Sequence, residues 1–236
     1  MIPDLSVVIL CYRAGNRAED FVARVVKMLD RFVSSWEIIL VGNYREGTED
    51  ETPRVVNRIA AKRANIKAVA VPKEGMMGWD ARSGLSMATG KYICFIDGDE
   101  QMPFRDIVRV YRKIKENDLD LVKTYRAIRG DGWARIVIST IFNIMFFVMF
   151  PGFYARDVNS KPKIIRKEAY DKMDLSSDDW FLDAEIMILA RRLKLKVAAI
   201  PSRFYKCNYR NSFVGLSTIF EFLRNMFNFR MKEFFR

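Results

Sequence analysis

An acidic cluster follows a run of strand-forming residues in the segment KYICFIDGDEQMP. Asp97 and Asp99 are separated by one glycine, and Gln101 follows two residues later. Carboxylate and amide oxygens are the ligands that Mg²⁺ and Mn²⁺ prefer. A capped, solvated turn would also fit these residue types. Because the preceding strand is apolar and Gly98 permits a tight turn, we favour a cation site that bridges a diphosphate.

Strands and helices alternate in the half of the chain that leads to this cluster. Strands are predicted at Leu5–Leu10, Trp36–Gly42, Ile66–Val71 and Tyr92–Asp97. Helices are predicted between them at Ala18–Phe32, Pro53–Ala64 and Trp79–Ala88. Strands that are apolar on both faces indicate an α/β fold, with a mostly parallel sheet covered by helices on both sides. Ligands of such sheets bind beyond the carboxyl ends of the strands, where the acidic cluster lies.

The second half of the chain is less regular. Its predicted elements are a helix at Phe104–Asn117, a strand at Leu119–Arg126, an apolar helix at Ile136–Phe150 and a strand at Lys196–Pro201. No internal repeat or low-complexity linker divides the chain. We expect one domain, residues 1–211, and a C-terminal amphipathic appendage, residues 212–236, that is rich in basic and aromatic residues.

The composition narrows the chemistry. The 236 residues carry a formal net charge of +11, which favours nucleic acid, anionic lipid or a phosphorylated substrate as partner. The absence of histidine removes the commonest general base and transition-metal ligand. Three widely spaced cysteines argue against a disulfide framework and favour the cytoplasm or the cytoplasmic face of a membrane. The longest apolar stretch, Ile136–Phe150, is shorter than the roughly 20 residues of a spanning helix, and no signal peptide is expected.

Two glycine-bearing loops, VGNYREGTEDET and KEGMMGWDARSG, follow predicted strands. Neither has the spacing of a Walker loop or of a dinucleotide-binding fingerprint. Arginines at 126, 129 and 135 could instead hold phosphates. For any one of these arginines taken alone, a solvated basic face is the favoured interpretation.

The order of these segments resembles the inverting GT-A glycosyltransferases of the dolichyl-phosphate mannosyltransferase and polyprenyl-phosphate glycosyltransferase type. The resemblance runs from Leu5 to about Gly215 and is most specific in ATGKYICFIDGDEQMP. It implies a Rossmann-like GT-A fold and inverting transfer of a sugar, from GDP-mannose or a UDP-sugar, to a polyprenyl or dolichyl phosphate. It also implies that Asp97 lies near the nucleotide and that Asp99 and Gln101 bind the Mg²⁺ or Mn²⁺.

The same resemblance assigns residues farther along the chain. Arg135 and Ser139 resemble a pair that contacts the donor diphosphate or the lipid phosphate, and Arg129 resembles a second phosphate contact. In the segment RDVNSKPKIIRKEAY, Asp157 and Ser160 match family positions, and Lys163 stands where the family carries an arginine. Further matches or substitutes for donor-binding residues are Glu185, Arg210, Lys206 and Ser212.

Some positions depart from the family pattern. The family's second strand usually ends in two acids, whereas this chain has Asn43, which would hydrogen-bond a base edge or a hydroxyl. The nucleotide therefore stays open. Cys207 and Phe213 replace a phosphate-binding arginine and a lysine. Asp178, Asp179 and other acids near 180 could recognise a sugar or complement a helix dipole.

A polyprenyl phosphate is already an anionic nucleophile, so its glycosylation needs no general base. Such an acceptor would bring the enzyme to a bilayer surface, with the apolar helix at 136–150 and the appendage as interfacial amphipathic helices. Packing of the appendage on the domain or on another subunit fits its sequence equally well. We expect a peripheral protein, with a membrane-anchoring partner subunit as one option.

Two other functions are open. A GT-A enzyme that acts on a soluble or polysaccharide hydroxyl would need a carboxylate base, with Asp157, Asp183 and Glu185 as candidates. A non-catalytic basic module for membranes or nucleic acid is less favoured, because it leaves the strand-end acids unexplained. We expect no nucleic-acid partner.

Overall fold

Seven strands form one sheet in the part of the chain that the computed structural model describes, residues 2–130, 132–152, 156–206 and 216–234. The strands are β1 (Leu5–Leu10), β2 (Trp36–Val41), β3 (Ile66–Val69), β4 (Tyr92–Asp97), β5 (Leu121–Arg129), β6 (Lys163–Arg166) and β7 (Val197–Phe204). Their order is β3-β2-β1-β4-β6-β5-β7, and only β6 is antiparallel to its neighbours. The predicted α/β class with a mostly parallel sheet is confirmed.

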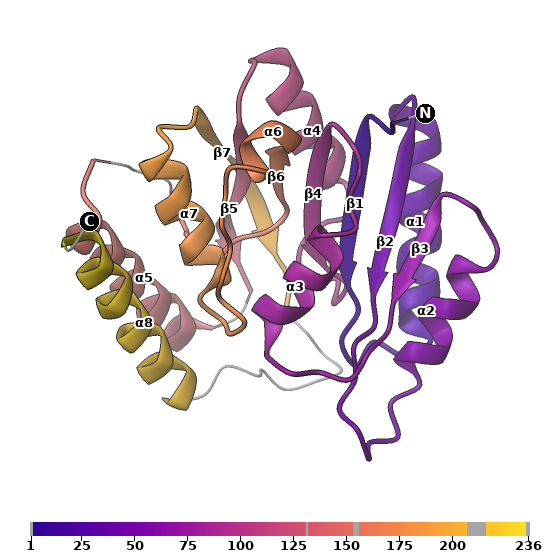
Figure 1. Ribbon diagram of the computed structural model, residues 1–236, viewed down its shortest axis with the longest axis horizontal. Coiled ribbons are helices and arrows are strands. Elements are labelled where there is room, and N and C mark those ends of the chain that lie inside the picture. The colour runs from indigo at the N-terminus through magenta and orange to yellow at the C-terminus, as the bar shows by residue number, and fades with distance from the viewer. Residues whose placement is uncertain (1, 131, 153–155, 207–215, 235–236) are drawn as a thin grey trace.

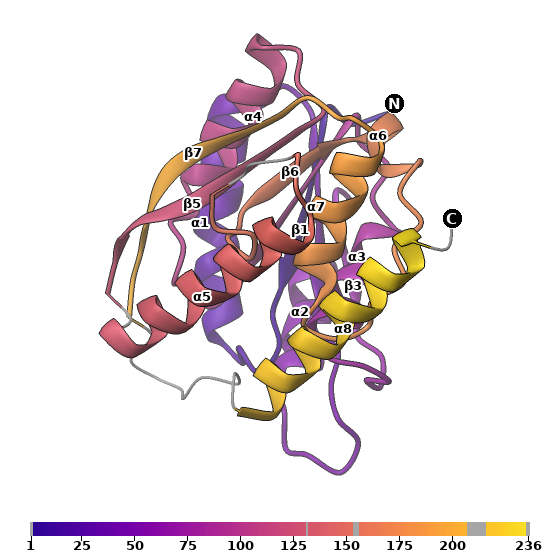
Figure 2. The same ribbon diagram turned by 90° about the vertical axis from the view of Figure 1, so that its left-hand side faces the viewer.

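Helices cover both faces of this sheet (Figure 1). One face carries α1 (Arg17–Phe32), α2 (Thr52–Ala60) and α4 (Asp106–Glu116). The other carries α3 (Met77–Leu85), α6 (Lys167–Tyr170) and α7 (Leu182–Arg192). The two longest helices, α5 (Trp133–Met149) and α8 (Leu216–Phe234), lie side by side at the edge of this second layer (Figure 2).

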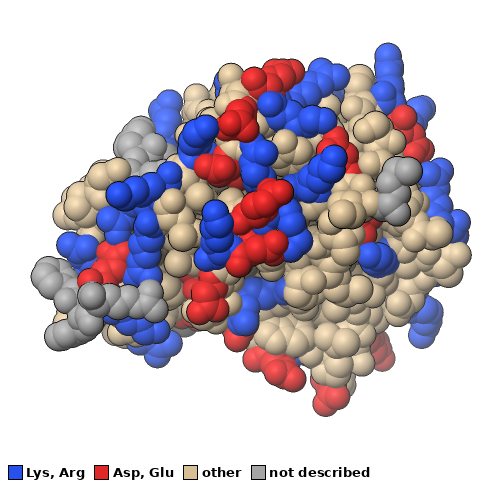
Figure 3. Space-filling model, turned by 45° about the horizontal axis from the view of Figure 1, so that its top comes forward, with Lys and Arg blue, Asp and Glu red and all other residues tan. Residues whose placement is uncertain are grey.

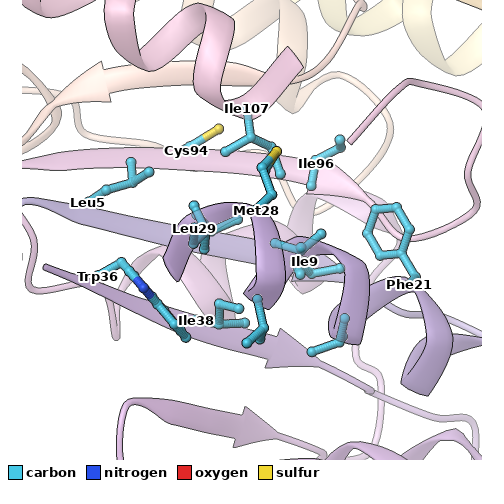
Figure 4. Close-up of a cluster of buried hydrophobic side chains, with 14 of the residues drawn as sticks. Leu5, Ile9, Phe21, Met28, Leu29, Trp36, Ile38, Cys94, Ile96 and Ile107 are labelled. Atoms are coloured by element: carbon cyan, nitrogen blue, oxygen red, sulfur yellow. The ribbon is translucent and has the colours of Figure 1, made fainter. Parts of the chain in front are cut away.

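The core under α1 follows directly from the sequence pattern. Apolar residues recur three or four positions apart along α1, and Phe21 and Leu29 of this helix lie in one buried cluster with Ile9 and Ile38 of the sheet (Figure 4). These side chains are buried, and each contributes roughly 1.5–3 kcal/mol to folding. This face of the sheet therefore forms a rigid support for the loops at the strand ends.

Strand β6 was not predicted. It runs antiparallel between β4 and β5, with Ile164 opposite both Cys94 and Val122. Four residues are too few to show a periodicity, so only the pairing partners on both sides reveal the strand. Strand β5 also extends past the predicted end at Arg126, because β7 pairs with it as far as Arg129. The insertion leaves β4 and β5 parallel to each other, so their carboxyl ends meet at one edge.

Helix α8 is seated on the domain. Met226 is fully buried, and the Phe222 ring lies 5.0 Å from the Phe142 ring of α5. Glu233 accepts hydrogen bonds from Arg191 and Arg192 of α7. One face of α8 therefore packs on the domain, as expected in one of the two interpretations of the C-terminal appendage. Within the described residues, we find no helix whose length and hydropathy would allow it to cross a bilayer.

Charges of both signs are interspersed on the face that Figure 3 shows. Ion pairs link the segments at the amino ends of the strands: Lys115 lies 2.8 Å from Asp4, and Arg166 lies 2.7 Å from Asp118. Despite the high net charge, this face therefore does not present a patch of one sign.

Candidate active site

The acidic cluster lies at the carboxyl edge of the sheet. Asp97 is the last residue of β4 and is in register with Leu10 of β1. The Gly98 amide donates to the Leu10 carbonyl at 2.8 Å, and a Cβ at Gly98 would lie 3.1 Å from that oxygen. Glycine therefore allows the chain to leave the sheet sharply, and Asp97 and Asp99 are partly exposed just beyond it.

Gln101 is oriented by its neighbours. Its side-chain nitrogen donates to the Tyr205 carbonyl at 3.1 Å, and the Tyr205 amide donates to the Gln101 carbonyl at 2.8 Å. The Asp99 carboxylate accepts from the backbone N–H of Gln101 at 3.1 Å. Since the side-chain nitrogen of Gln101 donates to Tyr205, the side-chain oxygen is the atom of this amide that could accept or bind a cation.

These oxygens suit a hard divalent cation. In the described part of the chain, no group of three or more acids, cysteines or histidines gathers at one point to hold a metal. Mg²⁺ sites of nucleotide enzymes are commonly completed by substrate phosphates rather than by an all-protein cage. Asp99 and Gln101, with Asp97 close by, would therefore hold the ion together with a diphosphate.

Asp97 is the partly exposed end of a chain of ion pairs that runs into the protein. We call the four residues Asp97, Lys161, Asp183 and Lys163 the buried ion network. The Lys161 ammonium is 3.3 Å from the Asp97 carboxylate and 2.9 Å from that of Asp183. Lys163 also pairs with Asp183, and its side chain is fully buried. Burial disfavours charge on Lys161, but the two carboxylates outweigh it and raise the pKa of Lys161. Likewise, burial favours the neutral acid at Asp183, but Lys161 and Lys163 outweigh it and lower its pKa.

Sequence reasoning missed Lys161. It matched Lys163 to a family arginine and expected it to bind the donor, whereas the structure places Lys163 out of contact with solvent. Both lysines contact Asp183, Lys161 from the bend before β6 and Lys163 from the first residue of the strand. No local pattern in the sequence indicates this shared partner.

Asp157 and Ser160 fix the loop before β6 against β5. Arg126 donates to both carboxylate oxygens of Asp157, at 2.7 and 2.6 Å. Ser160 and Thr124 share a hydrogen bond of 2.8 Å, and the fully buried Lys123 donates to the carbonyl of Asp157. Arg126 is therefore engaged in an ion pair rather than turned to a phosphate.

The ion pair between Arg126 and Asp157 should make a contribution to stability that is lost in acid. Burial raises the pKa of Asp157, but Arg126 outweighs it and holds the folded-state pKa well below the unfolded value of about 3.9. The contribution is therefore complete above the unfolded pKa and is lost as pH falls through the folded pKa. We expect Asp157→Asn to cost about 3 kcal/mol at pH 7 and to flatten the loss of stability below about pH 4. Urea unfolding from pH 3 to 8 measures both effects; an unchanged acid limb would contradict the assignment.

The predicted phosphate-contacting residues come together on β5 and α5. Arg129, the last residue of β5, donates to the Ser139 hydroxyl. Arg135 lies one turn earlier on α5 and is partly exposed. The Gly130 amide donates to the Phe204 carbonyl at 2.9 Å, next to the Tyr205 that holds Gln101. The arginines and the acidic cluster therefore belong to one edge of the sheet.

Two predicted donor contacts are engaged inside the protein. The fully buried Asn43 donates to Asp80 and Ser83, both at 3.0 Å, and accepts from the Val71 amide at 3.2 Å. It ties the end of β2 to the segment after β3 and to α3. The Glu185 carboxylate accepts from Ser176 and Ser177, in the loop before α7. Both side chains are buried, and their hydrogen bonds position these segments. Donor binding by Asn43 or Glu185 stays a prediction.

Several residues of the sequence analysis lie outside the described residues. They are Arg210, Cys207, Ser212 and Phe213.

The fold and this edge define a GT-A-type α/β protein, as predicted. The chain belongs to the family "Glycosyl transferase family 2", which matches residues 6–187. It is 25% identical over 218 residues to a dolichyl-phosphate beta-glucosyltransferase of Dictyostelium discoideum, covering 83% of this chain and 64% of that protein. It is 28% identical over 145 residues to an undecaprenyl-phosphate 4-deoxy-4-formamido-L-arabinose transferase of Sodalis glossinidius, covering 61% of this chain and 43% of that protein. The chain thus spans less than two thirds of either relative.

A solved structure supports the fold alone. Glucosyl-3-phosphoglycerate synthase from Mycobacterium tuberculosis, crystallised with Mn²⁺, UDP and glucosyl-3-phosphoglycerate, superposes with a TM-score of 0.67 at 18% identity. The match covers 95% of this chain and 77% of that one.

Proposed function

We propose that this protein transfers a sugar from a nucleoside-diphosphate sugar to a polyprenyl or dolichyl phosphate, with inversion at the sugar. One observation carries this proposal. The edge that gathers Asp97, Asp99 and Gln101 also gathers the arginines of β5 and α5, and α5 turns apolar side chains outward. An acceptor that is anionic at one end and hydrocarbon at the other matches such a surface.

The residues divide the work. Asp99 and Gln101 would hold Mg²⁺ or Mn²⁺, which when bound supplies positive charge to the diphosphate leaving group. Arg129 and Arg135 would hold the acceptor or donor phosphates, and Ser139, which Arg129 already contacts, would orient them. The acceptor phosphate attacks as an anion, so the protein's contribution is positioning and charge stabilisation.

The hydroxyl-acceptor alternative needs a carboxylate base, and the three candidates suit that role poorly. Arg126 lowers the pKa of Asp157 despite its burial, and the lysines lower that of Asp183. Glu185 is buried and accepts three hydrogen bonds. Acids held ionised at low pH, or enclosed, are weak proton acceptors at neutral pH. This favours an acceptor that arrives already ionised.

The outer faces of α5 and α8 supply the surface for the lipid. Exposed apolar residues of this surface, which we call the apolar face, are Ile138, Ile141, Ile144, Val148, Phe220 and Phe227. Val148 is 75% exposed and Phe220 72%. Lys232 and Arg230 lie on the same helix α8, and basic residues beside exposed apolar ones are typical of interfacial helices on anionic lipid. We propose peripheral attachment at the cytoplasmic face, where the free Cys11 and Cys94 would stay reduced.

The direct test is a transfer assay with Mn²⁺ or Mg²⁺, UDP- and GDP-sugars, and a short polyprenyl phosphate. We expect a lipid-phosphate sugar product that requires metal. Transfer to a soluble sugar with none to the polyprenyl phosphate would favour the alternative acceptor. Product formed equally well with a chelator would remove the metal from the proposal.

Membrane attachment gives a separate prediction. Val148→Glu combined with Phe220→Glu should reduce co-flotation with vesicles containing anionic lipid by about tenfold or more, because each change puts a charge at the bilayer surface. Both positions are exposed, so the melting temperature should hold. Phe32→Glu, a change at a half-exposed phenylalanine on α1 across the sheet, is the matched control. Equal flotation of all three proteins would contradict an interfacial role for α5 and α8.

A further inference from the structure

We propose that Lys161 is a positioning residue that couples metal binding to binding of the donor diphosphate. Until the donor binds, the Lys161 ammonium balances the charge of the Asp97 carboxylate and so weakens its attraction for the metal. This inference rests on the proposed cation site at Asp99 and Gln101. It concerns a lysine that the sequence analysis did not assign.

The Lys161 ammonium is held in place by Asp183 in the interior of the protein. Its 2.9 Å contact with Asp183 is buried, and Asp183 is in turn paired with the fully buried Lys163. Surface lysines sample many rotamers, and their ion pairs contribute little. The Lys161 side chain is only 7% exposed, so its charge stays next to Asp97.

The net charge of the buried ion network affects how strongly a divalent cation can bind beside Lys161. The buried ion network contains two lysines and two aspartates, so it is neutral when all four are ionised. A divalent cation that binds two residues beyond Asp97 therefore meets a carboxylate whose charge Lys161 already balances. The loss of that attraction weakens binding of the metal alone.

A nucleoside diphosphate reverses this balance. Its negative charge is attracted both by the ammonium and by the cation, so metal and diphosphate each improve the other's binding. Thermodynamic linkage requires this effect to be reciprocal. The protein would therefore take up the metal mainly together with the donor, and release both after transfer.

Mn²⁺ binding, measured by the electron paramagnetic resonance of the free ion, tests the proposal without any turnover. In the unsubstituted protein, UDP or GDP should tighten Mn²⁺ binding by about tenfold or more. Lys161→Met should bind Mn²⁺ alone about tenfold more tightly and lose most of the effect of the nucleotide. Lys161→Arg should restore the original behaviour, because it returns the charge.

The controls separate the possible failures. Lys167→Met removes a partly exposed lysine of a surface ion pair and should change neither value. Lys161→Gln serves as a second neutral variant if methionine beside Asp183 prevents folding, since glutamine can donate to both carboxylates. Unchanged Mn²⁺ affinity in a folded neutral variant overturns the role of Lys161. Unchanged Mn²⁺ affinity in Asp99→Asn is a different result: it overturns the cation site and, with it, the proposed metal-dependent transfer.

Discussion

Asp99→Asn should reduce sugar transfer by at least about 100-fold while the protein stays folded. The substitution keeps the size of the side chain and removes the charge that would hold the metal beside the diphosphate. Asp99 is partly exposed beyond the end of β4, so it contributes little to the core. Steady-state rates with saturating donor, together with the melting temperature, measure the two quantities.

Glu100→Gln is the matched control for this variant. Glu100 is adjacent in sequence, but its carboxylate pairs with Arg24 of α1 at 2.7 Å, and both side chains are exposed. It should retain activity within about twofold, because exposed ion pairs contribute under about 1 kcal/mol. If both variants lost activity alike, or Asp99→Asn kept full activity, Asp99 would have no specific role in transfer.

Asp183→Asn should lower the free energy of unfolding by about 3–5 kcal/mol at pH 7. Asp183 is 2% exposed, and it is the carboxylate that both Lys161 and Lys163 contact. Without its charge, two buried ammonium groups would be left with insufficient compensation. The measurement is the urea midpoint and slope.

Asp171→Asn provides the comparison on the surface. Asp171 also pairs with a lysine, Lys167, but more than half of its side chain is exposed. We expect a loss of about 0.5 kcal/mol or less. Similar losses in the two variants would show that the buried ion network does not hold the site together.

Much of the candidate site at the carboxyl ends of the strands could be predicted, because it depends on residues that are adjacent in the sequence. Strand β4 is apolar, Gly98 permits a turn, and Asp97 and Asp99 must then leave the sheet where parallel strands end. The alternation of strands and helices likewise predicted which edge of the sheet carries the ligands.

The partners of the buried side chains could not be predicted in the same way. The resemblance to the family led to the prediction that Asn43 and Glu185 contact the donor. Their hydrogen bonds in the structure reach Asp80 and Ser176, which the fold brings close. A polar residue in a sequence does not reveal whether water, substrate or another segment satisfies it.

The sequence by itself determined the α/β class, the acidic cluster at the end of β4 and the apolar character of α5, because each depends on residues adjacent along the chain. Only the tertiary structure decided that β6 enters between β4 and β5, and that Lys161 lies between Asp97 and Asp183. Lys161 is 64 residues from Asp97 in the chain. Contacts at such separations form only when many weak local preferences are satisfied together, so no short pattern contains them.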